Sequence, residues 1–120
     1  MKYLLLIYGN AELWESFTEE DHTRVVLETN ALQSELKASG EWVGAYGVAD
    51  QDEAKTVTLR DGAPVVSDGP YIEAKEYIGS FDIIDCDSLE RALEIAAKVP
   101  FARFGSVEVR PLMHEAAPDV

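Results

Sequence analysis

Short apolar runs bounded by turn residues predict six strands in this chain. The first run, Lys2–Tyr8, is continuously apolar after its lysine and stops at Gly9-Asn10, as a buried strand does. The pair Asp61-Gly62 separates two alternating segments and indicates a hairpin turn. Strands are accordingly expected at residues 2–8, 41–48, 55–60, 63–67, 79–86 and 107–112.

Two longer segments carry the apolar spacing of helices. The first is expected from Thr18 to about Ala38, with Thr18 and Asp21 approximating a capping box and Gly40 ending the helix. A second helix is expected over Leu89 to about Lys98, and residues 11–17 are predicted to be a loop anchored by its aromatic side chains. Intervals of three and four place one stripe of the first helix toward the sheet: His22, Val25, Thr29, Leu32 and Leu36.

The order of these elements predicts a ferredoxin-like α+β fold, βαββαβ, with an inserted hairpin. One domain is expected over residues 1–113, followed by a C-terminal tail at 114–120 that is predicted to be disordered. Two helices cover only one face of such a sheet, yet the first strand is apolar on both sides. We therefore expect the other face to be covered by the sheet of a second subunit in a two-fold homodimer.

Charge and cysteine content limit the partners. The chain has 120 residues, of which 47% are hydrophobic, and a formal net charge of −13 from 10 basic and 23 acidic residues. Such a surface repels nucleic acid and anionic membranes, so neither is expected as a partner, and neutral or cationic small ligands are favoured. Acidity of this kind also simply keeps a protein soluble.

Location follows from the cysteine count and from the opening run. Cys86 is the only cysteine, so no intrachain disulfide can form, and neighbouring acids disfavour its reactive thiolate. The opening apolar run is too short for a signal peptide or a membrane span. A soluble, cytoplasmic protein is expected.

The segment 67–76 concentrates turn residues and charges where a short hairpin connection would suffice. Asp68-Gly69-Pro70 shapes a turn, and the charges after it are either ligand contacts or a solvated run. His22 is either a semi-buried structural histidine or a general acid/base oriented by Asp68. No nucleophile elbow, phosphate-binding loop, dinucleotide fingerprint or calcium loop is present, so no cofactor and no metal site are expected.

The loop contains the motif Asp68-Gly69-Pro70-Tyr71, followed by Glu73, Lys75, Glu76 and Gly79. This motif resembles the YCII-related family, specifically its DGPF-domain branch. Residues 1–8, 88–100 and 107–111 are also similar to that family's opening strand, second helix and ending. The resemblance implies a ferredoxin-like fold that forms a dimeric α/β barrel. It also implies a catalytic His–Asp pair, onto which His22 and Asp68 map.

One residue departs from that resemblance. Tyr71 stands where the branch has phenylalanine, and its added hydroxyl changes the polarity of any pocket that the ring lines. Ligand preference is therefore not carried over from relatives. The association of family members with alternative sigma factors implies a sensory or accessory role with a regulatory protein partner.

Three functional hypotheses follow. The first is a small-molecule site in each subunit, with His22 and Asp68 as a weak acid/base pair and a ligand-contacting loop of Gly69, Pro70, Tyr71, Glu73 and Lys75. The second is a non-catalytic ligand-binding or regulatory module that meets a protein partner. The third is a structural dimer without a site. The absence of a strong nucleophile favours the second hypothesis, and the predicted inward position of His22 favours the first.

Overall fold

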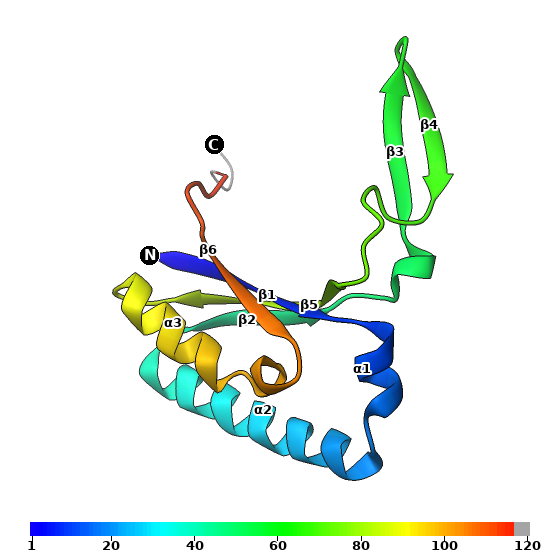
Figure 1. Cartoon of the computed structure of the whole chain (residues 1–120). Coiled ribbons are helices and arrows are strands. Elements are labelled where there is room, and N and C mark those ends of the chain that lie inside the picture. Colours follow the sequence, from blue (N-terminus) through cyan, green and yellow to red (C-terminus); the bar gives the residue numbers. More distant parts are fainter. Residues whose placement is uncertain (117–120) are drawn as a thin grey trace.

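A four-stranded antiparallel sheet forms the centre of the computed structural model, which describes residues 1–116 (Figure 1). Its strands lie in the order β2-β5-β1-β6, and their bounds are β1 Lys2–Gly9, β2 Trp42–Gly47, β5 Tyr77–Asp85 and β6 Ser106–Pro111. The helices α2 (Glu19–Ser39) and α3 (Leu89–Lys98) cover one face. The prediction of an α+β fold is confirmed, and the strand order is compatible with the ferredoxin-like arrangement. The predicted tail at 114–120 lies partly outside the described residues.

Helix α2 begins and ends at the residues that the sequence indicates. The Thr18 hydroxyl accepts the Asp21 backbone N–H at 3.0 Å, and the Asp21 carboxylate accepts the Thr18 N–H at 3.1 Å. Gly40 ends the helix in the left-handed conformation, with φ of 78°. No helix in the described part of the chain is long and apolar enough to cross a bilayer.

The prediction of a loop at residues 11–17 is wrong, because Ala11–Ser16 form the short helix α1. Asn10 starts it, since its side-chain oxygen accepts the Leu13 backbone N–H at 2.8 Å. The anchoring role of the aromatic residues is confirmed. Trp14 and Phe17 pack with Phe101, whose ring centroid lies 5.3 Å from that of Trp14. Two predicted connections also contain short 3-10 turns, η1 at Gln51–Glu53 and η2 at Pro100–Arg103.

The core lies between the helices and one face of the sheet. Its fully buried side chains include Leu5, Leu36, Ile84 and Ile95. The predicted inward stripe of α2 is correct for its buried valine and leucines, but His22 is exposed. At 1.5 Å per residue the helix is about 32 Å long, whereas eight residues of β1 span about 26 Å, so α2 is longer than this strand, and its first turn, which carries His22, is mostly exposed.

The single cysteine belongs to this core. Cys86 is buried, and burial raises the pKa of its thiol. The Cys86 Sγ also contacts the Ser88 carbonyl oxygen at 3.4 Å. An unreactive thiol was expected from neighbouring acids, but burial is the larger cause.

Within residues 1–116, no helix covers the opposite face of the sheet. Leu4 lies opposite Ile83 and Leu6 opposite Phe81, so these four side chains share this face. Tyr46 continues the patch, with its ring centroid 5.3 Å from that of Phe81. We call these five residues the open-face patch. The expectation that β1 is buried on both sides therefore does not hold for a single chain, in which Leu4 and Leu6 are only half-buried.

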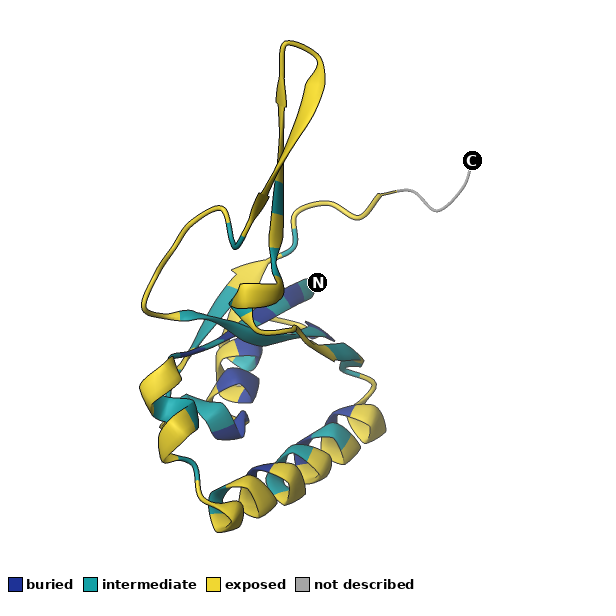
Figure 2. Ribbon diagram, turned by 90° about the vertical axis from the view of Figure 1, so that its right-hand side faces the viewer, coloured by how far each residue is buried: buried dark blue, intermediate teal, exposed yellow. Residues whose placement is uncertain are grey.

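The inserted hairpin is confirmed and projects from the body of the molecule (Figures 1 and 2). It consists of β3 (Lys55–Arg60) and β4 (Ala63–Asp68), which pair only with each other. Asp61 and Gly62 both have positive φ, 51° and 81°, as a two-residue hairpin turn of the primed kind requires. In both views the hairpin lies on the side of the sheet away from α2.

Candidate functional site

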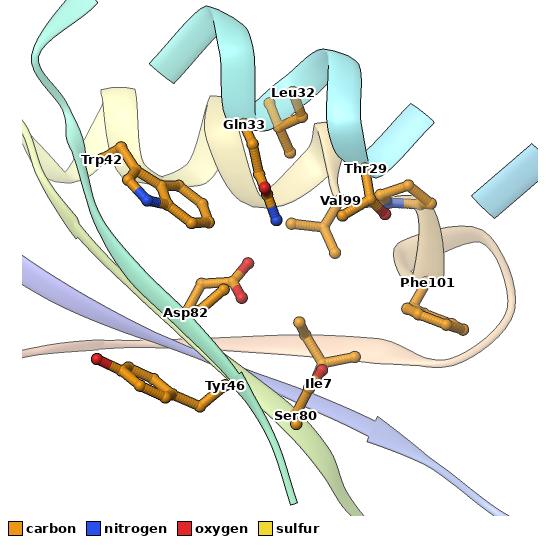
Figure 3. A pocket seen from close by; sticks show the side chains of 13 residues that line it. Ile7, Thr29, Leu32, Gln33, Trp42, Tyr46, Ser80, Asp82, Val99 and Phe101 are labelled. Carbon is orange, nitrogen blue, oxygen red and sulfur yellow. The ribbon is translucent and has the colours of Figure 1, made fainter. Parts of the chain in front are cut away.

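A cavity of about 290 Å³ lies between α2 and the helix-facing side of the sheet (Figure 3). Its walls are mainly apolar, with Trp42 on one side and Leu32, Val99 and Phe101 toward the other. Four polar side chains also line it: Thr29, Gln33, Ser80 and Asp82. An apolar cavity with a few convergent polar groups is the usual form of a ligand site, and its volume is at the small end of the roughly 300 to 1,000 Å³ range. We call it the Asp82 cavity.

Asp82 is the charged residue at the centre of this cavity. It lies on β5, opposite Leu5 of β1 and Ala45 of β2, and therefore on the helix-facing side of the sheet. Its half-buried carboxyl group points toward the cavity (Figure 3). Burial raises the pKa of Asp82 from 3.8 to about 6. No salt bridge within residues 1–116 involves Asp82, and burial is the one cause of the raised pKa.

The polar groups around Asp82 come from two elements. Gln33 and Thr29 lie one turn apart on α2, and Gln33 extends from the helix toward the carboxyl group (Figure 3). Ser80 precedes Asp82 by two residues on β5 and so faces the same side of the sheet. Together they provide hydroxyl and amide groups that can orient a ligand beside a carboxyl group able to give or take a proton near pH 6.

The structure places His22 and Asp68 apart within one chain. His22 lies in the first turn of α2, in a shallow surface hollow with Phe17 and Thr18. Asp68 ends β4 at the base of the hairpin, where its carboxylate pairs with Lys55. Because α2 and the hairpin lie on opposite sides of the sheet, a His22–Asp68 pair would need a second chain.

The loop after β4 brings four of the predicted ligand-contacting residues together. Gly69, Pro70, Glu73 and Lys75 line one wide surface hollow, which 3-10 turn η1 borders on the other side. Tyr71 is not part of it, and 83% of its surface is exposed to solvent. The loop residues are thus near one another, but they form an open surface rather than an enclosed site.

Comparison with known proteins identifies a family. The family model of the YCII-related domain matches residues 1–116. The chain belongs to the YCII-related family. An uncharacterized protein from Rhizobium meliloti (strain 1021) is similar to it, with 32% identity over 114 residues, which cover 93% of this chain and 92% of that protein.

Membership of the YCII-related family confirms the resemblance seen in the sequence. The DGPF-domain branch stays a prediction, because the match is to the YCII-related domain as a whole. That relative is an uncharacterized protein, so it indicates no ligand and no reaction. The chemistry of this YCII-related protein has therefore to be argued from its own side chains.

Asp82 is the residue of this YCII-related protein that the sequence reading missed. The alternation of the strand indicates its position, because Asp82 lies two residues before the buried Ile84 and so on the same, inward side. A charged residue at such a position lowers the stability of the fold unless it is paired, so an unpaired one suggests a function. The charges of segment 67–76 are more numerous, but all of them are exposed in the structure, whereas Asp82 is a single charge among apolar neighbours.

Proposed function

We infer that this protein binds a small, partly apolar molecule in the Asp82 cavity, where the Asp82 carboxyl exchanges a proton with the ligand. The observation that carries this function is a carboxyl group in an apolar cavity, whose pKa is raised to about 6 and which has no charged partner among the described residues 1–116. Groups with such raised pKa values gather at functional sites, because catalysis near neutral pH needs both protonation states. Gln33, Thr29 and Ser80 supply the polar contacts that would fix the orientation of the ligand.

A screen of small metabolites by thermal shift tests this function. We expect hits that stabilise the wild-type protein and whose affinity falls about tenfold or more in Asp82→Asn. Asp68→Asn is the matched control, since it makes the same chemical change at the exposed end of β4. If ligand affinity depends on Asp68 and not on Asp82, the site lies at the loop and this proposal is wrong.

A homodimer through the open-face patch is the assembly that we propose. The patch is apolar and lies on the face of the sheet that the helices leave uncovered. A second copy with the same patch would cover it by two-fold symmetry, which is the commonest way in which soluble proteins bury such a face. The Asp82 cavity lies on the opposite face and would stay accessible in this dimer.

Analytical ultracentrifugation at micromolar concentration checks the dimer. We expect the wild-type protein to sediment as a dimer and Ile83→Lys to sediment as a monomer, because the lysine places a charge in the centre of the patch. Val57→Lys is the control, since Val57 lies on the projecting hairpin and is 62% exposed. A monomeric wild-type protein, or an Ile83→Lys variant that remains a dimer with an unchanged circular dichroism spectrum, contradicts the proposal.

The second candidate function is a regulatory module that acts through a protein partner. One face of the hairpin carries Val57 and Leu59, which are 62% and 70% exposed, opposite Val66 and Pro64 of the neighbouring strand. An apolar strand face that projects into solvent is suited to contact another protein. In this function the predicted site residues would serve as contacts to the partner rather than as catalytic residues. They are His22, Asp68 and the loop residues Gly69, Pro70, Tyr71, Glu73 and Lys75.

A further inference from the structure

The charge of the Asp82 cavity distinguishes among classes of ligand. Asp82 is the residue of the lining that carries a formal charge, since the other residues are apolar or neutral. Tyr46 is the other titratable residue of the lining, and its ring packs against Phe81 on the open face. A half-buried carboxylate without a counter-charge in the lining is destabilised, so a ligand that supplies a positive charge gains the most from binding there.

The shape of the cavity adds a second constraint. Leu32, Val99 and Phe101 form an apolar wall beside Asp82, and Gln33 reaches toward the carboxyl group from above (Figure 3). A ligand with one polar end and an apolar body matches this division. A primary ammonium group donates three hydrogen bonds; the Asp82 carboxylate is a charged acceptor for them, and the Ser80 hydroxyl of the lining is a neutral one.

The aromatic wall also suits a cation. The Trp42 side chain lies near Asp82 in the cavity lining (Figure 3), and an indole ring attracts cations through its electron-rich face. It already accepts one cation, because the Lys37 ammonium lies 5.9 Å from its centroid. Lys37 itself is exposed and is not part of the cavity lining. The net charge of −13 further attracts a cation to the protein.

We propose that the ligand of the Asp82 cavity is a small protonated organic amine with an apolar body, whose ammonium group pairs with the Asp82 carboxylate. This proposal rests on the proposed function, because it names the class of ligand for the same cavity. The apolar body lies against Leu32, Val99 and Phe101, and the ammonium lies between Asp82 and Gln33. The volume of about 290 Å³ limits the ligand to roughly the size of a single amino-acid side chain with its amine.

Matched pairs of amines and alcohols test the proposal. Benzylamine, cyclohexylmethylamine and isopentylamine are each compared with the alcohol of the same carbon skeleton by isothermal titration calorimetry at pH 7.5. We expect at least one amine to bind about tenfold or more tightly than its alcohol, because only the amine forms the ion pair. In Asp82→Asn this preference should disappear, while Asp87→Asn, which makes the same change at an exposed position outside the cavity, should retain it.

The pH dependence gives a second readout on the wild-type protein. Because the pKa of free Asp82 is about 6, lowering the pH from 7.5 to 5 neutralises most of the carboxyl group and should weaken amine binding about tenfold. Binding of the alcohols should change little. These amines stay protonated from pH 5 to pH 7.5, so the change in affinity reflects protonation of the protein and not of the ligand.

The outcomes separate the two proposals. In one outcome, amines and alcohols bind equally well, and both lose affinity when Ser80→Leu fills the cavity. The cavity then binds ligands without selecting cations, and the amine proposal alone is wrong. If an amine preference persists in Asp82→Asn, the cation lies elsewhere and the proposal is overturned. If no amine binds more tightly than its alcohol in the wild-type protein, the proposal is also overturned, whereas the metabolite screen decides the proposed function independently.

Discussion

Replacing Asp82 by asparagine should raise the free energy of unfolding by about 2 to 3 kcal/mol at pH 7.5 and change it little at pH 4. The side chain is half-buried, and burial raises the pKa of its carboxyl from 3.8 to about 6. Between these two pH values the folded state holds a proton that the unfolded state has lost. Stability therefore falls as the pH rises from 4 to 6, and the full loss persists above 6. Asparagine resembles the neutral acid in shape and carries no charge, so it avoids this loss.

Urea denaturation of both proteins at pH 4, 5, 6, 7 and 8 measures the difference. The wild-type curve alone is insufficient, because the many surface carboxylates also make stability depend on pH. The difference between wild type and Asp82→Asn isolates the one group. Asp87→Asn is the control, since Asp87 is exposed and its replacement should shift stability by no more than about 0.5 kcal/mol. A difference that is flat with pH would show that Asp82 is not held in an environment that disfavours its charge.

This expected gain in stability also bears on function. A stabilising replacement that also weakens ligand binding is the pattern of a stability–activity trade-off at a functional site. Asp82→Asn should therefore be more stable and bind ligand more weakly, a combination that a purely structural aspartate would not show. Measuring both properties on the same protein sample links the stability of the cavity to its proposed use.

Replacing Gly105 by alanine should lower the free energy of unfolding by about 3 kcal/mol. A Cβ atom at this position would lie 2.2 Å from the backbone carbonyl oxygen of Tyr8, which belongs to the central strand β1 and cannot move aside. The Gly105 N–H also donates to the Phe101 carbonyl oxygen at 2.8 Å. The added methyl group would therefore displace the turn that holds Phe101 against the Asp82 cavity.

Thermal and urea denaturation of Gly105→Ala check this result, with Gly47→Ala as the matched control. A Cβ atom at Gly47 meets nothing within 4 Å, and Gly47 does not have positive φ. Its replacement should therefore change stability by no more than about 0.5 kcal/mol. Equal stability of the two variants would mean that β1 and the turn at Gly105 are not as close as the structure shows. A second readout is ligand affinity, which Gly105→Ala should reduce through Phe101.

Local sequence signals were enough to predict most elements of this fold. The capping box at Thr18 and Asp21, the left-handed Gly40 and the Asp61-Gly62 turn each act within a few residues. Their hydrogen bonds and backbone angles depend little on the rest of the chain, so they can be recognised without it. The short helix α1 was missed because six residues are too few to show a period, although its Asn10 cap was readable.

The candidate site is where the sequence was insufficient. The spacing along α2 predicts that His22 faces inward, but spacing does not reveal that the first turn of this helix is mostly exposed. The charges of segment 67–76 suggested a site, and only the tertiary structure shows that they lie on an open surface. Both errors concern what lies opposite a side chain, which depends on elements distant in the sequence.

The sequence by itself determined the order of the strands and main helices, the inserted hairpin and the membership of the YCII-related family. It also contained the inward position of Asp82, because the alternation of strand β5 places this residue on the same side as Ile84. Only the tertiary structure decided that Gln33, Trp42 and Phe101 meet around that carboxyl group. These residues come from separate elements of the fold, and packing rather than local propensity brings them together.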